Sequence, residues 1–273
     1  MSSVFLYLLI VHFIADYYLQ NENLANEKKT KYKYILKHSF IYAICSFVFL
    51  IPIWSSTLII YFMSFSIAHF FIDTLKFYIV NKYIDFANEH EVPIYLIDQA
   101  MHICTIFIIS QLIYDYNVIV ELLPLLSKFE PEYNRLLRPI LVLLLIFKPV
   151  NITFKITYSH IKNSISSGNL SDETTESPGQ VISVMTDGES VASSDEEKEL
   201  NVGKLIGNLE RLLVLILLSV NEYSAIGLIF AAKSITRYNQ IASNKRFAEY
   251  YLLGTLYSIL ATLIIYQSVF VWI

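Results

Sequence analysis

Histidine and aspartate recur at a spacing of four residues in three apolar stretches of the sequence. The first is HFIAD at 12–16, the second is HFFID at 69–73, and the third is DQAMH at 98–102, where the order is reversed. Residues four apart lie on one face of an α-helix, about 6 Å apart along its axis. Each stretch therefore predicts a helix edge that carries one imidazole and one carboxylate, groups that bind divalent transition metals.

The three aspartates lie in segments that are apolar enough to cross a bilayer. A carboxylate near the centre of a membrane helix costs about 2.5 to 3.5 kcal/mol on insertion scales, so three of them need compensation. A divalent cation would supply it, either as one ion with outer partners or as a pair of ions that share a carboxylate. Two alternatives stay open: His–Asp hydrogen bonds within each helix, and a path for protons or ions.

Composition assigns these segments to a membrane protein. The 273 residues are 55% hydrophobic and 16% charged, which is outside the usual range of soluble domains. A membrane helix needs about 20 largely apolar residues. We expect an all-α, multi-pass transmembrane helix bundle of about eight spans, at 4–20, 38–54, 57–80, 94–114, 139–158, 204–220, 223–238 and 247–272. The sixth and seventh spans are short, so 204–238 either crosses twice or forms a re-entrant hairpin.

Lysine and arginine favour cytoplasmic loops and set the expected orientation. The segment after the first span carries Lys28, Lys29, Lys31, Lys33 and Lys37. We therefore expect this segment on the cytoplasmic side and both termini outside. The first and third spans then run toward the cytoplasm and the fourth runs away from it, which matches the reversed order of DQAMH. The three pairs are predicted to converge at one depth in the cytoplasmic half of the bundle.

One polar segment interrupts the apolar ones. Residues 163–203 are rich in Ser, Thr, Asp, Glu and Gly and lack apolar periodicity, which is typical of chains that cannot offset their ordering entropy by burial. We expect a disordered acidic cytoplasmic linker, which is a spacer or a docking site for an unidentified partner. It separates the membrane helices of 1–162, with the His/Asp pairs, from those of 204–273 in the same bundle. Nucleic acid is not an expected partner, because the basic residues form no stripe along one element.

The stretches HFIADYYLQ, LKHSF, AHFFIDTLKF, DQAMH and LIGNLERLLV resemble a family of bacterial polytopic membrane proteins catalogued as domain of unknown function 3307. In that family, HxxxD in the first helix followed by LQ is a hallmark. The resemblance implies a bacterial inner or plasma membrane. The order of VHF, KHS, SIAHFFIDTL and GNLER is similar, more distantly, to membrane-bound metal-dependent hydrolases. This second resemblance implies His38, His69 and Asp73 as metal ligands or their supports, with Glu210 and Arg211 completing the site.

The combined expectation is a membrane-embedded metal-dependent hydrolase whose site opens to the cytoplasmic leaflet. Its cofactor is a divalent ion, zinc or manganese, that lowers the pKa of a bound water so that a nearby carboxylate takes the proton. The expected ligands are His12, Asp16, His69, Asp73 and His102, with Asp98 or Glu210 as the base and Arg211 on an anionic group of the substrate.

A site at this depth suits a lipid-like, amphiphilic substrate that is taken from the bilayer. Two other functions stay open. One is an ion carrier or proton-coupled carrier that uses the same His/Asp set. The other is a non-catalytic membrane protein that recruits a partner through the acidic linker.

Overall fold

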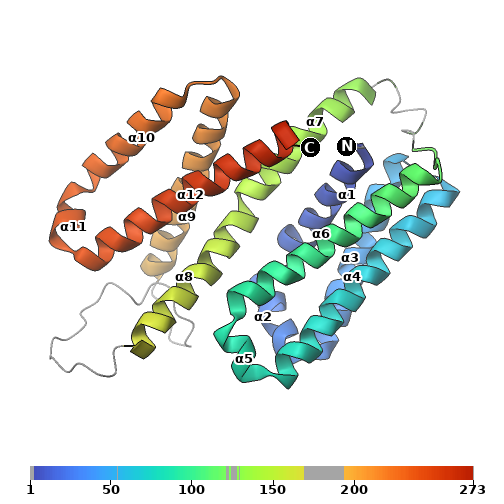
Figure 1. The fold of residues 1–273 in the computed structure, drawn as a ribbon, viewed down its shortest axis with the longest axis horizontal. Coiled ribbons are helices and arrows are strands. Elements are labelled where there is room, and N and C mark those ends of the chain that lie inside the picture. Colours follow the sequence, from blue (N-terminus) through green and yellow to red (C-terminus); the bar gives the residue numbers. More distant parts are fainter. Residues whose placement is uncertain are drawn as a thin grey trace. The chain divides into compact units, whose positions relative to one another are not determined.

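The computed structural model describes residues 3–53, 55–120, 123, 128, 130–168 and 194–272. Every regular element within these ranges is a helix, as the sequence predicts. The helices form two compact units, and Figure 1 shows the path of the chain through each. The first unit comprises Met1–Pro149 and Val269–Ile273, and the second comprises Val150–Ser268.

The first unit contains the N-terminal helices. Its α-helices are α1 (Ser3–Phe13), α2 (Glu22–Thr30), α3 (Tyr32–Leu50), α4 (Ser56–Lys82), α5 (Ile84–Glu89), α6 (Glu91–Asp115) and α7 (Glu130–Ile146). Two short elements extend this set: α1 continues into the π-helix η1 (Ile14–Tyr18), and α3 ends in the 3-10 turn η2 (Ile51–Ile53).

The helix α1 is central to the first unit. Every residue from Phe5 to Phe13 is buried. A helix that is apolar on all faces needs neighbours around it, and α1 packs against α3, α6 and α7, while α4 packs against α3 and α6. The C-terminal end of α1 therefore brings its polar residue, His12, into the interior of this unit.

The chain turns sharply after η1. The segment Ser3–Tyr18 and the helix α2 meet at an angle of 84°. Asn21 begins α2, because its side-chain oxygen accepts a hydrogen bond of 2.8 Å from the backbone N–H of Leu24. Leu24 is also the buried residue of this otherwise polar helix. The predicted first span, 4–20, thus ends where the chain bends, and α2 contacts α3 and α4.

The second unit contains the C-terminal helices. They are α8 (Lys148–Gly168), which begins at the unit boundary, then α9 (Ser194–Ser219), α10 (Tyr223–Thr236), α11 (Tyr238–Ser243), α12 (Lys245–Gln267) and the π-helix η4 (Ser268–Trp272). In this unit α9 packs against α10 and α12. Asn221 has a positive φ of 62° in the turn after α9, a conformation that asparagine adopts more readily than most residues and that ends helices.

Five helices are long and apolar enough to cross a membrane, which indicates a membrane protein. They cover Tyr32–Ile53, Ser56–Lys82, Glu91–Asp115, Arg135–Ile161 and Phe247–Val271, and they correspond to five of the predicted spans. The bent N-terminal segment would make a sixth. The count of eight is not confirmed. The helix α10 has only 14 residues, and the predicted span 204–220 contains Lys204, Glu210 and Arg211.

The predicted linker 163–203 is helical at both ends. The helix α8 continues to Gly168 and α9 begins at Ser194, while residues 169–193 lie outside the described part of the chain. The two units also divide at Pro149 rather than at the linker. Proline has no backbone N–H for the preceding turn, which agrees with the break between the end of α7 and the start of α8.

Candidate metal centre

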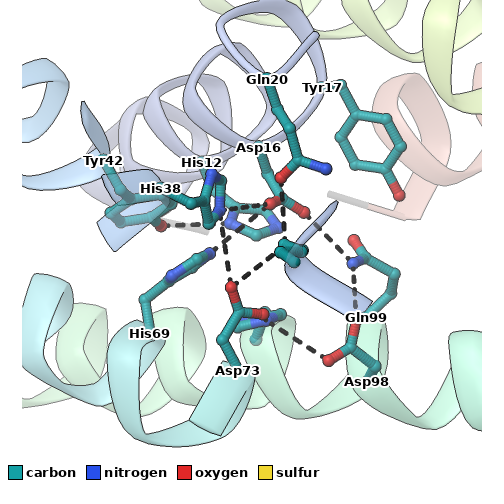
Figure 2. A network of polar contacts seen from close by, with 12 residues as sticks. His12, Asp16, Tyr17, Gln20, His38, Tyr42, His69, Asp73, Asp98 and Gln99 are labelled. Carbon is teal, nitrogen blue, oxygen red and sulfur yellow. Dashed lines mark hydrogen bonds and ion pairs between the residues drawn. The ribbon is translucent and has the colours of Figure 1, made fainter. Parts of the chain in front are cut away.

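Seven titratable side chains meet in the interior of the first unit (Figure 2). They come from α1, η1, α3, α4 and α6, and we call them the His/Asp cluster: His12, Asp16, His38, His69, Asp73, Asp98 and His102. Six are buried, and the side chain of Asp16 is only 10% exposed. The predicted convergence of the three His/Asp pairs is therefore present, with His38 as a fourth imidazole. The roles of these residues as ligands stay predictions.

The contacts of the cluster run mainly between helices. Asp16 Oδ1 lies 3.1 Å from His38 Nε2 and 3.7 Å from His69 Nε2. Asp98 and His102 meet within one helix, with 3.7 Å between Oδ1 and Nε2. Hydrogen bonds confined to each helix, the alternative that needs no metal, therefore do not account for the arrangement.

Asp16 reaches its partners from the π-helix η1. The backbone N–H of Leu19 donates to the carbonyl of Ile14 at 3.0 Å, so the turn spans five residues instead of four. Such wide turns are rare and occur frequently at functional sites. The turn brings Asp16 Oδ1 to the imidazoles, while Asp16 Oδ2 accepts a hydrogen bond of 3.3 Å from Gln99 Nε2.

Asp73 faces two sides of the cluster. Its Oδ1 lies 3.8 Å from His102 Nε2, and its Oδ2 lies 3.6 Å from His38 Nε2. Two groups of three ligands result, each with its ligand atoms within 4.8 Å of one another: Asp16, His38 and His69, and His69, Asp73 and His102. We call them the two ligand groups. Because they share His69, their five residues surround one place in the bundle.

The donor set fits a divalent metal ion. Imidazole and carboxylate bind zinc at about 2.0 to 2.2 Å, so two ligands of a tetrahedral site are about 3.3 Å apart. The nitrogen-to-oxygen distances given above are 3.1 to 3.8 Å. The Nε2 atoms of His38, His69 and His102 are buried and have no hydrogen-bond partner of normal geometry among the described residues. Since buried polar atoms are normally paired, these three nitrogens are suited to hold a ligand.

His12 lies beside the two ligand groups. Its Nδ1 is 3.1 Å from the Tyr42 hydroxyl, and its ring centroid is 5.2 Å from that of His102. Tyr42 also stacks on His69, with 3.6 Å between the centroids. His12 and Tyr42 therefore pack against the imidazoles of His69 and His102 and restrict their orientation.

Two lysines that the sequence argument did not assign to the site bind its carboxylates. Lys28 Nζ lies 3.1 Å from Asp73 Oδ2 and donates to Gln20 Oε1 at 3.0 Å. Lys76 Nζ donates to Asp98 Oδ2 at 2.8 Å. Part of the compensation that the aspartates need is thus supplied by ammonium groups. Three carboxylates facing two lysines leave one formal negative charge in the cluster, if the histidines are neutral.

The sequence carried a signal for only one of these lysines. Lys76 follows His69 and Asp73 at seven and three residues, a spacing that places all three on one helix face. The approach of Lys28 depends on the 84° bend before α2, and apolar periodicity does not predict a bend.

Asp98 belongs to the cluster but not to the two ligand groups. Its Oδ2 is bound by Lys76 and also accepts from Gln99 Nε2 at 3.3 Å. Its Oδ1 is buried beside His102 and has no hydrogen bond from the described residues. Asp98 therefore keeps one oxygen that can accept a proton.

Glu210 and Arg211 lie on α9 in the second unit. Glu210 Oε2 binds Lys233 Nζ at 2.6 Å. Arg211 is buried, and its Nη2 donates to the side-chain oxygens of Asn151 at 2.6 Å and Asn208 at 2.7 Å. All these partners belong to the second unit. The predicted contribution of Glu210 and Arg211 to the His/Asp cluster is therefore not among the contacts that the structure describes.

Residues 4–125 match the model of a family described as "Protein of unknown function (DUF3307)". The match covers nearly all of α1 to α6 and includes every residue of the His/Asp cluster together with Lys28 and Lys76. It does not reach LIGNLERLLV in α9, and the resemblance to membrane-bound hydrolases finds no support. Comparison with curated proteins and with solved structures gives no significant match.

Proposed function

We propose that the first unit binds one divalent metal ion in the His/Asp cluster and uses it for hydrolysis within the membrane. The observation that carries the proposal is the meeting of five candidate ligand residues from four segments, with three buried Nε2 atoms that face carboxylate oxygens without normal hydrogen-bond geometry. His69, which both ligand groups share, would be the central ligand. A mixed set of imidazole and carboxylate suits zinc best and also accepts manganese.

The residues around such an ion support a hydrolytic role. A bound divalent ion supplies a water that is acidic near neutral pH. Asp98 Oδ1 would take the proton of that water, because it lies beside His102 Nε2 and is not hydrogen-bonded to the described residues. Lys76 would hold the carboxylate through the other oxygen. The hydroxyl of the water would then bond to the electrophilic atom of the substrate, and the departing group would receive the proton from Asp98.

The proposed substrate is a lipid-like, amphiphilic molecule. The cluster is framed by α3, α4 and α6, each long and apolar enough to cross a membrane. We propose that the chain lies in the inner or plasma membrane of a bacterium, with the lysine-rich end of α2 and α3 on the cytoplasmic side. The cluster would then open to the cytoplasmic leaflet.

Elemental analysis of the detergent-purified full chain tests metal binding. We expect about one zinc or manganese ion per chain, as a single mononuclear site requires. Asp16→Asn and His38→Gln should lower this content, because each removes a ligand or its charge. Glu210→Gln is the matched control in the second unit and should retain the metal. A wild-type chain that takes up neither ion would refute the proposal.

Hydrolysis is tested with the metal-loaded protein in vesicles of labelled phosphatidylethanolamine and phosphatidylglycerol. We expect release of labelled product that a chelator abolishes. Asp98→Asn should abolish release and keep the metal, because Asp98 is outside the two ligand groups. Equal release by Asp98→Asn and wild type would remove Asp98 from the reaction.

An ion carrier is the second candidate, and one observation favours it. His12 and His38 have no exposed surface, and the ammonium group of Lys28 already binds a carboxylate among them. A small cation can enter such a place without the opening that a lipid needs. In the same vesicles, uptake of zinc or protons without product release would support a carrier and exclude hydrolysis of these lipids.

A further inference from the structure

We propose that Lys28 is a built-in competitor of the metal ion. Its ammonium group occupies the His/Asp cluster when the ion is absent and leaves when the ion binds. The inference rests on the proposed metal site and deepens it, because it names the residue that sets the affinity of the site.

Lys28 and the metal ion would compete for the same carboxylate. Lys28 Nζ lies 3.1 Å from Asp73 Oδ2, and the same oxygen lies 3.6 Å from His38 Nε2. An ion held by His69, Asp73 and His102 would share the carboxylate of Asp73 with that ammonium group. Two cations on one buried carboxylate repel each other strongly, because the surrounding dielectric is low.

The charges of the cluster favour exchange over joint occupancy. Asp16, Asp73 and Asp98 carry three negative charges, and Lys28 and Lys76 carry two positive charges. A divalent ion added to this set would leave one positive charge in the apolar interior. If Lys28 leaves, the ion and Lys76 balance the three carboxylates. Uncompensated charge inside a membrane bundle is costly, so the neutral arrangement is the one in which Lys28 has moved out.

Lys28 is placed where it can leave. It lies on α2, which follows the 84° bend and has one buried residue, Leu24. The Lys28 side chain is 16% exposed, whereas that of its partner Asp73 is 3% exposed. A lysine side chain is long and strongly hydrated, so it can turn its ammonium group to water without movement of its helix.

Lys76 provides the contrast. It lies on the long helix α4 and binds Asp98, which belongs to neither ligand group. Its ammonium group therefore does not occupy an oxygen that the ion would use. The two lysines form a matched pair for an experiment, since both bind cluster carboxylates and only one would compete.

Calorimetric titration of zinc into the full chain in detergent tests the inference. Lys28→Met should bind zinc at least about 10-fold more tightly than wild type, a change on the scale of groups next to metal ligands. Lys76→Met should tighten zinc binding less than Lys28→Met does, because it changes the charge of the cluster without freeing the carboxylate of Asp73. Unchanged or weaker binding by Lys28→Met would overturn the inference, because Lys28 would then be neutral or would support Asp73 as an outer partner.

A measurement on the unmutated chain avoids any effect of substitution on folding. Reductive methylation followed by peptide mass spectrometry reports how accessible each lysine is. Zinc should raise the methylation rate of Lys28 and leave that of Lys29, whose side chain is 63% exposed, unchanged. Zinc binding without a change at Lys28 would refute the competition alone. Absence of zinc binding in both wild type and Lys28→Met would refute the metal site itself.

Discussion

The two units bury charged groups among apolar helices but satisfy them in different ways. In the second unit, the Nη2 group of Arg211 donates to the neutral amide oxygens of Asn151 and Asn208, and Glu210 is paired with Lys233. In the first unit, three carboxylates and four imidazoles face two ammonium groups, and several imidazole nitrogens make no hydrogen bond of normal geometry to the described residues. Buried charge alone is thus no sign of a functional site. An excess of groups that can donate electron pairs to a cation is a stronger indication of one.

The largest effect should come from removing a ligand in the first unit. His69→Gln and Asp73→Asn should lower zinc affinity by more than about 100-fold, beyond the loss expected for outer partners. Asp73→Asn should still insert, because a neutral amide is cheaper in the membrane than a carboxylate. Metal content and calorimetry measure the change, and Arg211→Gln serves as control. Full metal content in both ligand variants, or an equal loss of metal in Arg211→Gln, would contradict the prediction that only the first unit binds the metal.

A smaller effect is expected on stability in the second unit. Arg211→Met removes the donor to the side-chain oxygen of Asn151 and one of the two donors to that of Asn208, which keeps the hydrogen bond from Asn151 Nδ2. The loss should cost about 1 to 3 kcal/mol of unfolding free energy. Thermal unfolding in detergent measures this loss, and the zinc affinity of the first unit should not change. Lys245→Met, which alters an exposed pair with Glu249, should unfold like wild type. A stability loss below the error of the method would mean that the hydrogen bond from Arg211 to Asn151 does not stabilise the packing of α9 against α8.

The smallest effect compares the two asparagines that begin helices. Asn21 caps α2 in the first unit and Asn244 caps α12 in the second. Replacement of either by alanine should cost about 1 kcal/mol of stability. Only Asn21→Ala should tighten zinc binding, and by less than Lys28→Met, because a loosened α2 holds Lys28 less firmly at Asp73. If both alanine variants bind zinc with the same affinity, the position of α2 does not affect metal binding.

Local periodicity was sufficient to predict much of the first unit. The pairs at 12–16, 69–73 and 98–102 depend on a spacing of four residues, which is a property of any α-helix. Their meeting followed from the alternating direction of consecutive spans. Five apolar spans were also recognised, because length and hydropathy are read directly from the sequence.

The remaining features depend on departures from regular helix geometry. The π-helix at Asp16 and the bend that brings Lys28 to Asp73 have no periodic signature. The hydrogen-bond partners of Arg211 also lie outside what apolar periodicity predicts. Asn208, three residues before it, accepts its hydrogen bond, as local side-chain partners often do in helices.

The position of the His/Asp cluster residues along the chain has a consequence for translation. All seven residues of the His/Asp cluster lie between His12 and His102, and α9 begins at Ser194. At about 5 to 20 residues per second, the ribosome completes the ligand set roughly 5 to 20 s before it begins α9. If the cluster binds a metal ion as proposed, the nascent chain can take up that ion while the C-terminal helices are still unmade.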